Sequence, residues 1–191
     1  ILAVNSIFRA FDYLIPDAPE LIFEKFIAGG QEADPLCIRN AMAMLSGCQP
    51  DLITAYLKER YAVVAVFDAE VQLVCLEHVR RHMTDDPSLS FEIYRQLLNS
   101  STPSVKYEAA VSVLRTLHDH PESSTIAGEV LRALVSLSAS NDSDDNVKLI
   151  ALENICALQE DFPDVMEDEA ALLDILRTLS SSDLKVRQKA L

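Results

Sequence analysis

One short pattern recurs along the chain and limits the possible fold more than any other feature. It is clearest in residues 102–114, where a turn leads into an aliphatic residue, a basic residue follows at once, and a small residue comes four places after the aliphatic one. Similar copies cover residues 34–45, 144–155 and 182–191, and a copy with Gln72 in the basic position follows Asp68. The aliphatic anchors stand at 38, 71, 105, 147 and 186, at spacings of 33, 34, 42 and 39 residues. Such spacings are typical of stacked helix pairs.

Apolar residues at helical spacing predict about eleven helices joined by short loops. Asp17 and Thr102 are expected to cap two of the helices, and Leu21, Ile22 and Phe26 to form the buried stripe of the second helix. Residues 61–67 are β-branched, yet we interpret them as helical because no second strand is near to pair with them. The helices are expected near residues 1–11, 17–29, 34–47, 49–67, 68–82, 86–98, 102–117, 123–138, 146–159, 165–179 and from 183 onward.

These helices predict an all-α fold, a HEAT or armadillo-type α-solenoid in which antiparallel helix pairs form a right-handed superhelix. We expect one solenoid segment of about five pairs over residues 1–191, with no separate second domain. The apolar periodicity runs to both ends, so a piece of a longer trunk is expected. Ala109, Ala110 and Ala151 are expected where neighbouring helices approach closely, because a short side chain lets them do so.

The basic residue of each repeat has two possible roles. In the first, these residues form a structural ladder with acids or carbonyls at neighbouring helix starts, with Asp34, Asp145 and Asp183 as candidate partners. In the second, they form a stripe that binds a partner. Gln72 interrupts the charge series, which favours the structural ladder. The ladder residues are Arg39, Lys106, Lys148 and Arg187.

Composition excludes several classes of protein. Sixteen basic and thirty acidic residues give a net charge of −14, the wrong sign for binding a phosphate backbone, so no nucleic-acid partner is expected. The longest uninterrupted apolar run, residues 61–67, has seven residues, far fewer than the roughly 18 of a membrane-spanning helix. The four cysteines form no C-x-x-C pair and are interpreted as buried thiols in a reducing compartment.

Sites for metal or catalysis are not expected. Cys75, His78 and His82 can share one helix face, but they lack a fourth ligand and the H-E-x-x-H order, so we interpret the histidines as surface or hinge residues. A nucleophile elbow and a phosphate-cradling glycine loop are both missing from the sequence. The acidic runs at 142–145 and 167–169 are interpreted as solvated loop and helix-start charge. The expected activity is non-enzymatic, with no cofactor.

Several phrases resemble the amino-terminal trunks of the beta-COP family, the beta subunits of coatomer (COPI) vesicle coats. The VKYEAA phrase alone also resembles the adaptin-type trunks of clathrin adaptors, whereas its combination with LIPDAPELI favours the beta-COP family. The resemblance is collinear over nearly the whole chain and is weakest at residues 47–88 and 117–139. The phrases are LIPDAPELI at 14–22, RNA at 39–41, PSVKYEAA at 103–110, DNVKLI at 145–150 and DILR at 174–177.

The resemblance implies a cytoplasmic coat scaffold for Golgi–ER retrograde and intra-Golgi transport. Members of this family pair with other coatomer subunits, most directly delta-COP, and an Arf-family GTPase in its GTP form recruits them to Golgi membranes. Membrane association is therefore expected to be peripheral and through partners only. No motif matches the GTPase contact, so no partner-binding residue is assigned. The alternative is another adaptin-like or HEAT-repeat scaffold, such as a clathrin-adaptor large subunit, a transport receptor or a phosphatase scaffold.

Overall fold

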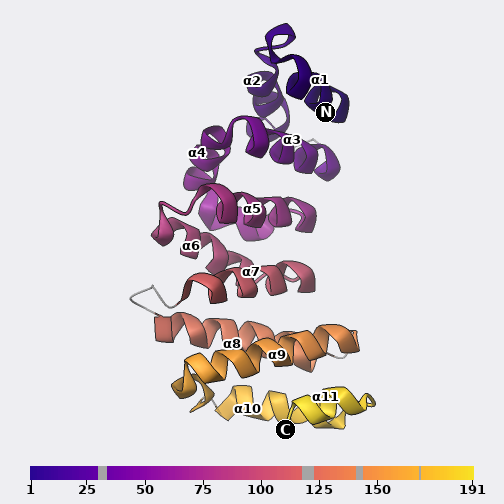
Figure 1. Ribbon diagram of the computed structural model, residues 1–191, viewed down its shortest axis with the longest axis vertical. Coiled ribbons are helices and arrows are strands. Elements are labelled where there is room, and N and C mark those ends of the chain that lie inside the picture. The colour runs from indigo at the N-terminus through magenta and orange to yellow at the C-terminus, as the bar shows by residue number, and fades with distance from the viewer. Residues whose placement is uncertain (30–33, 118–122, 141–143, 168) are drawn as a thin grey trace. The chain divides into compact units, whose positions relative to one another are not determined.

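The computed structural model describes residues 1–29, 34–117, 123–140, 144–167 and 169–191. These residues fall into two compact units, Ile1–Gln96 and Leu97–Leu191. Every regular element in the described ranges is helical, which confirms the all-α class (Figure 1). None of the helices in these ranges combines the length and hydropathy needed to cross a bilayer.

The first unit is built from successive helix pairs. Its second helices, α3 and α5, pack against each other, and α4 packs against both of them. In the first pair, α2 continues into a π-helix, η2, which packs on α3. The elements are α1 (Leu2–Phe11), η1 (Asp12–Leu14), α2 (Ala18–Ile22), η2 (Phe23–Ala28), α3 (Pro35–Cys48), α4 (Pro50–Arg60), η3 (Tyr61–Val66) and α5 (Ala69–His82); α6 (Pro87–Leu98) crosses the boundary between the units.

The second unit repeats this arrangement. The first helices of its pairs, α8 and α10, pack on each other, and so do the second helices, α9 and α11, while α8 also contacts α7 and α9. Stacking of like helices from pair to pair is the packing of a HEAT or armadillo-type solenoid, so this fold class is confirmed. The elements are α7 (Pro103–Thr116), α8 (Ser123–Ala139), α9 (Asp145–Asp161), η5 (Pro163–Glu167), α10 (Glu169–Arg177), η6 (Thr178–Ser180) and α11 (Leu184–Lys189). The right-handed superhelix and the single segment over 1–191 stay predictions.

An aspartate precedes four of the five second helices, and three of these aspartates cap their helix with the side chain. The Asp34 carboxylate accepts from Leu36 N at 2.9 Å, and those of Asp144 and Asp183 cap α9 and α11 in the same way. The predicted side-chain caps at Asp17 and Thr102 are wrong, because neither side chain makes a cap hydrogen bond. Asp17 has ψ near 0, away from the extended backbone that aims a capping carboxylate at the next amides. Both residues use their carbonyls instead, for Leu21 N and Lys106 N.

The core follows the repeat. The anchors Val71, Val105 and Val186 are buried, whereas Ile38 and Val147 are half-buried. The prediction that Leu21 belongs to the buried stripe is wrong, because its side chain is 62% exposed. The buried residues of α2 and η2 are Pro19, Ile22 and Ile27. Residues 61–66 form a 3₁₀ helix, which confirms a helical segment over a strand. The start predicted at 165 for the tenth helix is wrong, since a separate 3₁₀ turn ends at Glu167.

The alanines of the second helices are fully buried, as predicted: Ala109, Ala110 and Ala151 each have 0% exposed surface. Replacing Ala109 or Ala151 with leucine is expected to lower the free energy of unfolding by about 1–3 kcal/mol, because three extra carbons must fit into closed contacts. Urea unfolding of the variants measures the change. Ala55→Leu, at an exposed position of α4, is the matched control and should leave the midpoint nearly unchanged. Equal midpoints for all three variants would contradict close packing at the alanines.

Candidate functional site

Two ladder residues bind groups near the start of their own helix. Lys148 Nζ lies 3.4 Å from Asp145 Oδ1 on α9, and the side chain of Lys148 is only 16% exposed. Arg187 donates from one guanidinium nitrogen to the carbonyls of Ser181 at 2.7 Å and Ser182 at 3.1 Å. The carbonyls belong to the loop before α11, so Arg187 holds this loop against its own helix.

The other two ladder residues reach a neighbouring helix. Arg39 Nε on α3 lies 3.8 Å from Glu70 Oε2 on α5, and Lys106 Nζ on α7 donates to Ser136 Oγ on α8 at 3.1 Å. Of the predicted acidic partners, only Asp145 pairs with a ladder residue, while Asp34 and Asp183 cap their own helices. All four basic side chains therefore have a partner on their own or a neighbouring helix, and a continuous ladder stays a prediction.

Gln72 shows what the interrupted copy of the repeat retains. Its side chain is 3% exposed, and its Nε2 donates to the carbonyls of Ala65 at 2.7 Å and Phe67 at 2.8 Å. These carbonyls lie in the segment before α5, just as the carbonyls bound by Arg187 lie before α11. Gln72 therefore performs the same fixing role with a neutral amide. The sequence shows that this copy lacks the positive charge of the other copies, but the glutamine amide still offers two N–H donors.

Replacing Gln72 with methionine is expected to lower the free energy of unfolding by about 2–3 kcal/mol. The substitution keeps the side-chain volume and leaves the carbonyls of Ala65 and Phe67 without their donor. Urea unfolding measures the loss, and Gln188→Met, at an exposed position of α11, is the control. A Gln72→Met variant as stable as Gln188→Met would show that water replaces the amide at no cost.

The Cys75, His78 and His82 set forms no ligand cluster. Cys75 and His78 have no exposed surface, whereas His82 is exposed. The surface or hinge interpretation is therefore wrong for His78, whose ring nitrogens lie 2.9 Å from Ser46 Oγ and 2.9 Å from Thr54 Oγ1. Burial raises the pKa of the Cys75 thiol to about 12, so it stays protonated. In the described part of the chain, no group of three metal-binding side chains converges.

His78 has two partners because it lies where three helices meet, α5 with α3 and α4. Burial first, and the neighbouring His82 second, lower the pKa of His78 to about 4. The ring is therefore neutral at pH 7, and a neutral imidazole matches two hydroxyls in either tautomer. The serine and threonine that complete this contact carry no sequence signal that links them to the histidine.

The remaining predictions are placed as follows. Cys75 is a buried thiol as predicted, but Cys37, Cys48 and Cys156 are only half-buried, so the prediction is wrong for these three. In the acidic runs, residues 142, 143 and 168 lie outside the described residues. Asp144 is a cap of α9, which agrees with helix-start charge.

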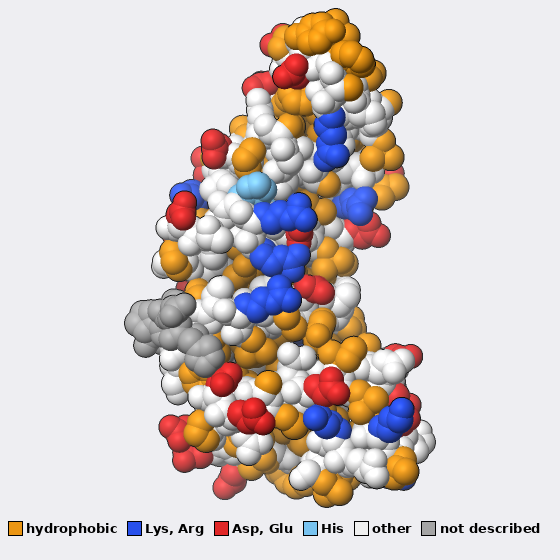
Figure 2. Space-filling view, in the orientation of Figure 1, with side chains coloured by type: hydrophobic (Ala, Val, Ile, Leu, Met, Phe, Trp, Pro, Cys, Tyr) orange, Lys and Arg blue, Asp and Glu red, His pale blue; other side chains and the backbone are white. Residues whose placement is uncertain are grey.

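An open groove of about 710 Å³ runs across α1, α3 and α5 of the first unit. Arg9, Arg39 and Arg81 surround it together with Glu70 and Glu77, and its apolar lining includes Ala43, Leu73 and Val74. Glu77 pairs with Arg81, and among the described residues no carboxylate lies within ion-pair distance of Arg9. Figure 2 shows basic side chains gathered on this face of the unit. Arginines around a partly apolar surface suit non-covalent contact with another protein.

Comparison with known proteins places the chain in a family. The adaptin N terminal region matches it over residues 1–191. The chain belongs to the adaptin N-terminal region family. This membership agrees with the stacked helix pairs of both units and with the sequence pattern that recurs in their second helices.

Several curated relatives of this adaptin-family chain are coatomer beta subunits. The chain is 37% identical over 194 residues to coatomer subunit beta of Dictyostelium discoideum and 38% identical over 194 residues to that of Pongo abelii. It is 34% identical over 195 residues to coatomer subunit beta of Saccharomyces cerevisiae. Each alignment includes 100% of this chain but only 19–20% of the relative, so the chain spans about a fifth of the proteins it matches.

Proposed function

We propose that this chain is a segment of the trunk of a coatomer beta subunit and acts as a non-enzymatic scaffold in a vesicle coat. The observation that supports this most is the similarity to coatomer beta subunits along all 191 residues. The stacked helices are consistent with a scaffold, because a solenoid offers an extended surface and needs no catalytic pocket. The basic, partly apolar groove of the first unit is one such surface.

The partners proposed for the whole protein are other coatomer subunits, delta-COP first, and an Arf-family GTPase in its GTP form. The corresponding location is the cytoplasm, with peripheral attachment to Golgi membranes and COPI-coated vesicles through these partners. These proposals rest on the family resemblance. The solenoid supports them only by providing surface.

A pulldown with the full-length protein tests the proposal. Immobilised protein is incubated with purified delta-COP and, separately, with an Arf-type GTPase locked in the GTP form or loaded with GDP. We expect delta-COP to be retained and the GTPase to be retained only in its GTP form. Binding of neither partner would refute the coatomer assignment, and the adaptin-type fold would stand. Retention of a clathrin-adaptor subunit in place of delta-COP would favour another adaptin-like scaffold.

A further inference from the structure

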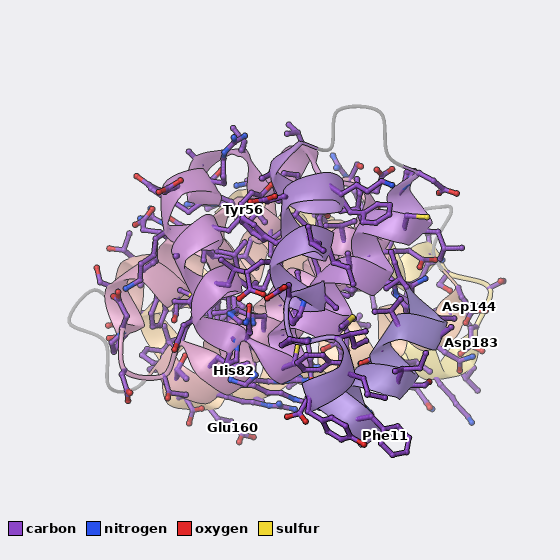
Figure 3. All side chains as sticks on the ribbon, turned by 90° about the horizontal axis from the view of Figure 1, so that it is seen from above. Phe11, Tyr56, His82, Asp144, Glu160 and Asp183 are labelled. Atoms are coloured by element: carbon purple, nitrogen blue, oxygen red, sulfur yellow. The ribbon has the colours of Figure 1, made fainter. Side chains whose placement is uncertain are left out.

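The loop before α11 borders a polar pocket of about 580 Å³ in the second unit. It is lined from three sides: by the end of α8, by Lys148 of α9, and by the segment from Arg177 to Ser182. Figure 1 shows α9, α10 and α11 as neighbours, and Figure 3, which is seen from above, labels Asp144 and Asp183 next to each other on one side. The starts of α9 and α11 therefore lie at the edge where the loop turns.

The lining of this serine pocket has the composition of an oxyanion site. Its two charged residues, Lys148 and Arg177, are both cations, although the whole chain carries a net charge of −14. Five of the other six lining residues carry a hydroxyl, and no carboxylate lines the pocket. Lysine, arginine and hydroxyl side chains are the groups that proteins use to hold phosphate oxygens. The hydroxyl-bearing residues are Ser138, Thr178, Ser180, Ser181 and Ser182.

Donors remain for a ligand at this pocket. Lys148 pairs with Asp145 at 3.4 Å, which uses one of the three N–H groups of its ammonium. Arg177 pairs with Asp174 and has further N–H groups, and its side chain is 75% exposed. The Ser182 hydroxyl has no hydrogen-bond partner among the described residues. Lys148 and Ser182 therefore bring N–H and O–H groups to the pocket for which the described part of the protein supplies no acceptor, and the oxygens of an anion would accept from them.

The loop itself is held in place before any ligand binds. Arg187 binds the carbonyls of Ser181 and Ser182, and Ser181 Oγ accepts from Asp183 N at 3.2 Å. The Asp183 carboxylate in turn accepts from the amides of Lys185 and Val186. A loop fixed in this way loses little conformational entropy on binding, which favours affinity.

We propose that the serine pocket binds a phosphate monoester, with Lys148 and Arg177 pairing with the phosphoryl oxygens and Ser182 donating to one of them. A monoester carries about −1.5 to −2 charges at pH 7, which matches two cations. The volume exceeds what a bare phosphate fills, so there is room for the esterified group. The pocket belongs to the second unit and the groove to the first, and binding at the pocket does not depend on the coat function.

Calorimetric titration of the full-length protein tests this site with glycerol 3-phosphate and with inorganic phosphate at constant ionic strength. We expect saturable binding of one glycerol 3-phosphate at the pocket, at least as tight as inorganic phosphate. Lys148→Met and Arg177→Gln should each raise Kd about tenfold or more, since each removes a charge-assisted hydrogen bond. Arg115→Gln removes an exposed charge from α7, outside the pocket, and should leave Kd unchanged.

Arg177→Gln keeps the test valid if Lys148→Met fails to fold, because Arg177 is largely exposed. Cosedimentation with vesicles containing phosphatidic acid, compared with phosphatidylcholine alone, separates a lipid head group from a soluble ligand. Vesicle binding that Arg177→Gln abolishes assigns the monoester to a lipid, and binding of the soluble probe alone assigns it to a soluble molecule. The proposal would be overturned if neither the soluble probes nor the phosphatidic acid vesicles bound, or if wild type, Arg177→Gln and Arg115→Gln had equal Kd values.

Discussion

Replacing His78 with alanine is expected to lower the free energy of unfolding by about 3–5 kcal/mol. The ring has 0% exposed surface and fills the place where α5 meets α3 and α4. Its loss opens a cavity and also removes the partner of two hydroxyls, Ser46 Oγ and Thr54 Oγ1, each 2.9 Å from a ring nitrogen. Both effects act in the same direction, which makes this the largest single-residue effect that we expect. Urea unfolding measures it.

His82 provides the matched control, because it is a histidine of the same helix with its ring 5.0 Å from that of His78. Its side chain is exposed, so His82→Ala should change the free energy of unfolding by no more than about 0.5 kcal/mol. If both alanine variants unfolded at the same urea concentration, His78 would not be the buried link that joins the three helices.

Acidification is expected to remove about 3 kcal/mol of stability through His78 alone. Burial, and secondly His82, lower the pKa of His78 from 6.5 to about 4 in the folded protein. Between these values the unfolded chain binds the proton and the folded chain does not, so protons favour unfolding. The contribution of His78 is therefore complete above pH 6.5 and is lost as the pH falls from 6.5 towards 4.

The measurement compares urea midpoints of wild type and His78→Gln at pH 7, 5.5 and 4.5. Glutamine does not titrate, and protonation of carboxylates affects both proteins alike, so the difference between them isolates the histidine. We expect wild type to lose its advantage over His78→Gln across this range. Parallel midpoints at all three pH values would mean that His78 takes up its proton in the folded state as readily as in the unfolded state.

The helices and the core of their repeats could be predicted from the sequence because they depend on local spacing. Val105 and Ala109, four residues apart, lie on one face of α7 wherever that helix is placed, and both are buried. The helix starts at Asp34, Asp144 and Asp183 are equally local, since a capping carboxylate reaches only the next few amides. Leu21 shows the limit: its spacing fits the stripe, yet its side chain is exposed.

Side chains that act between elements could not be predicted in this way. His78 and Thr54 are 24 residues apart, Arg39 and Glu70 are 31 apart, and nothing in either local pattern links them. The serine pocket likewise joins the end of α8, a lysine of α9 and the loop before α11, which no single motif contains.

The sequence by itself determined the all-α repeat, its period and the alanines at the close contacts, because periodicity reports which face of a helix is apolar. Only the tertiary structure decided which helices meet that face and which polar groups they bring. It shows that Gln72, which interrupts the charge series, donates hydrogen bonds that fix the segment before α5. It also shows that His78, which the sequence places at the surface, is a buried link between helices. The reason is that hydrogen bonds between helices depend on how the helices stack, and stacking is not a local property of any one of them.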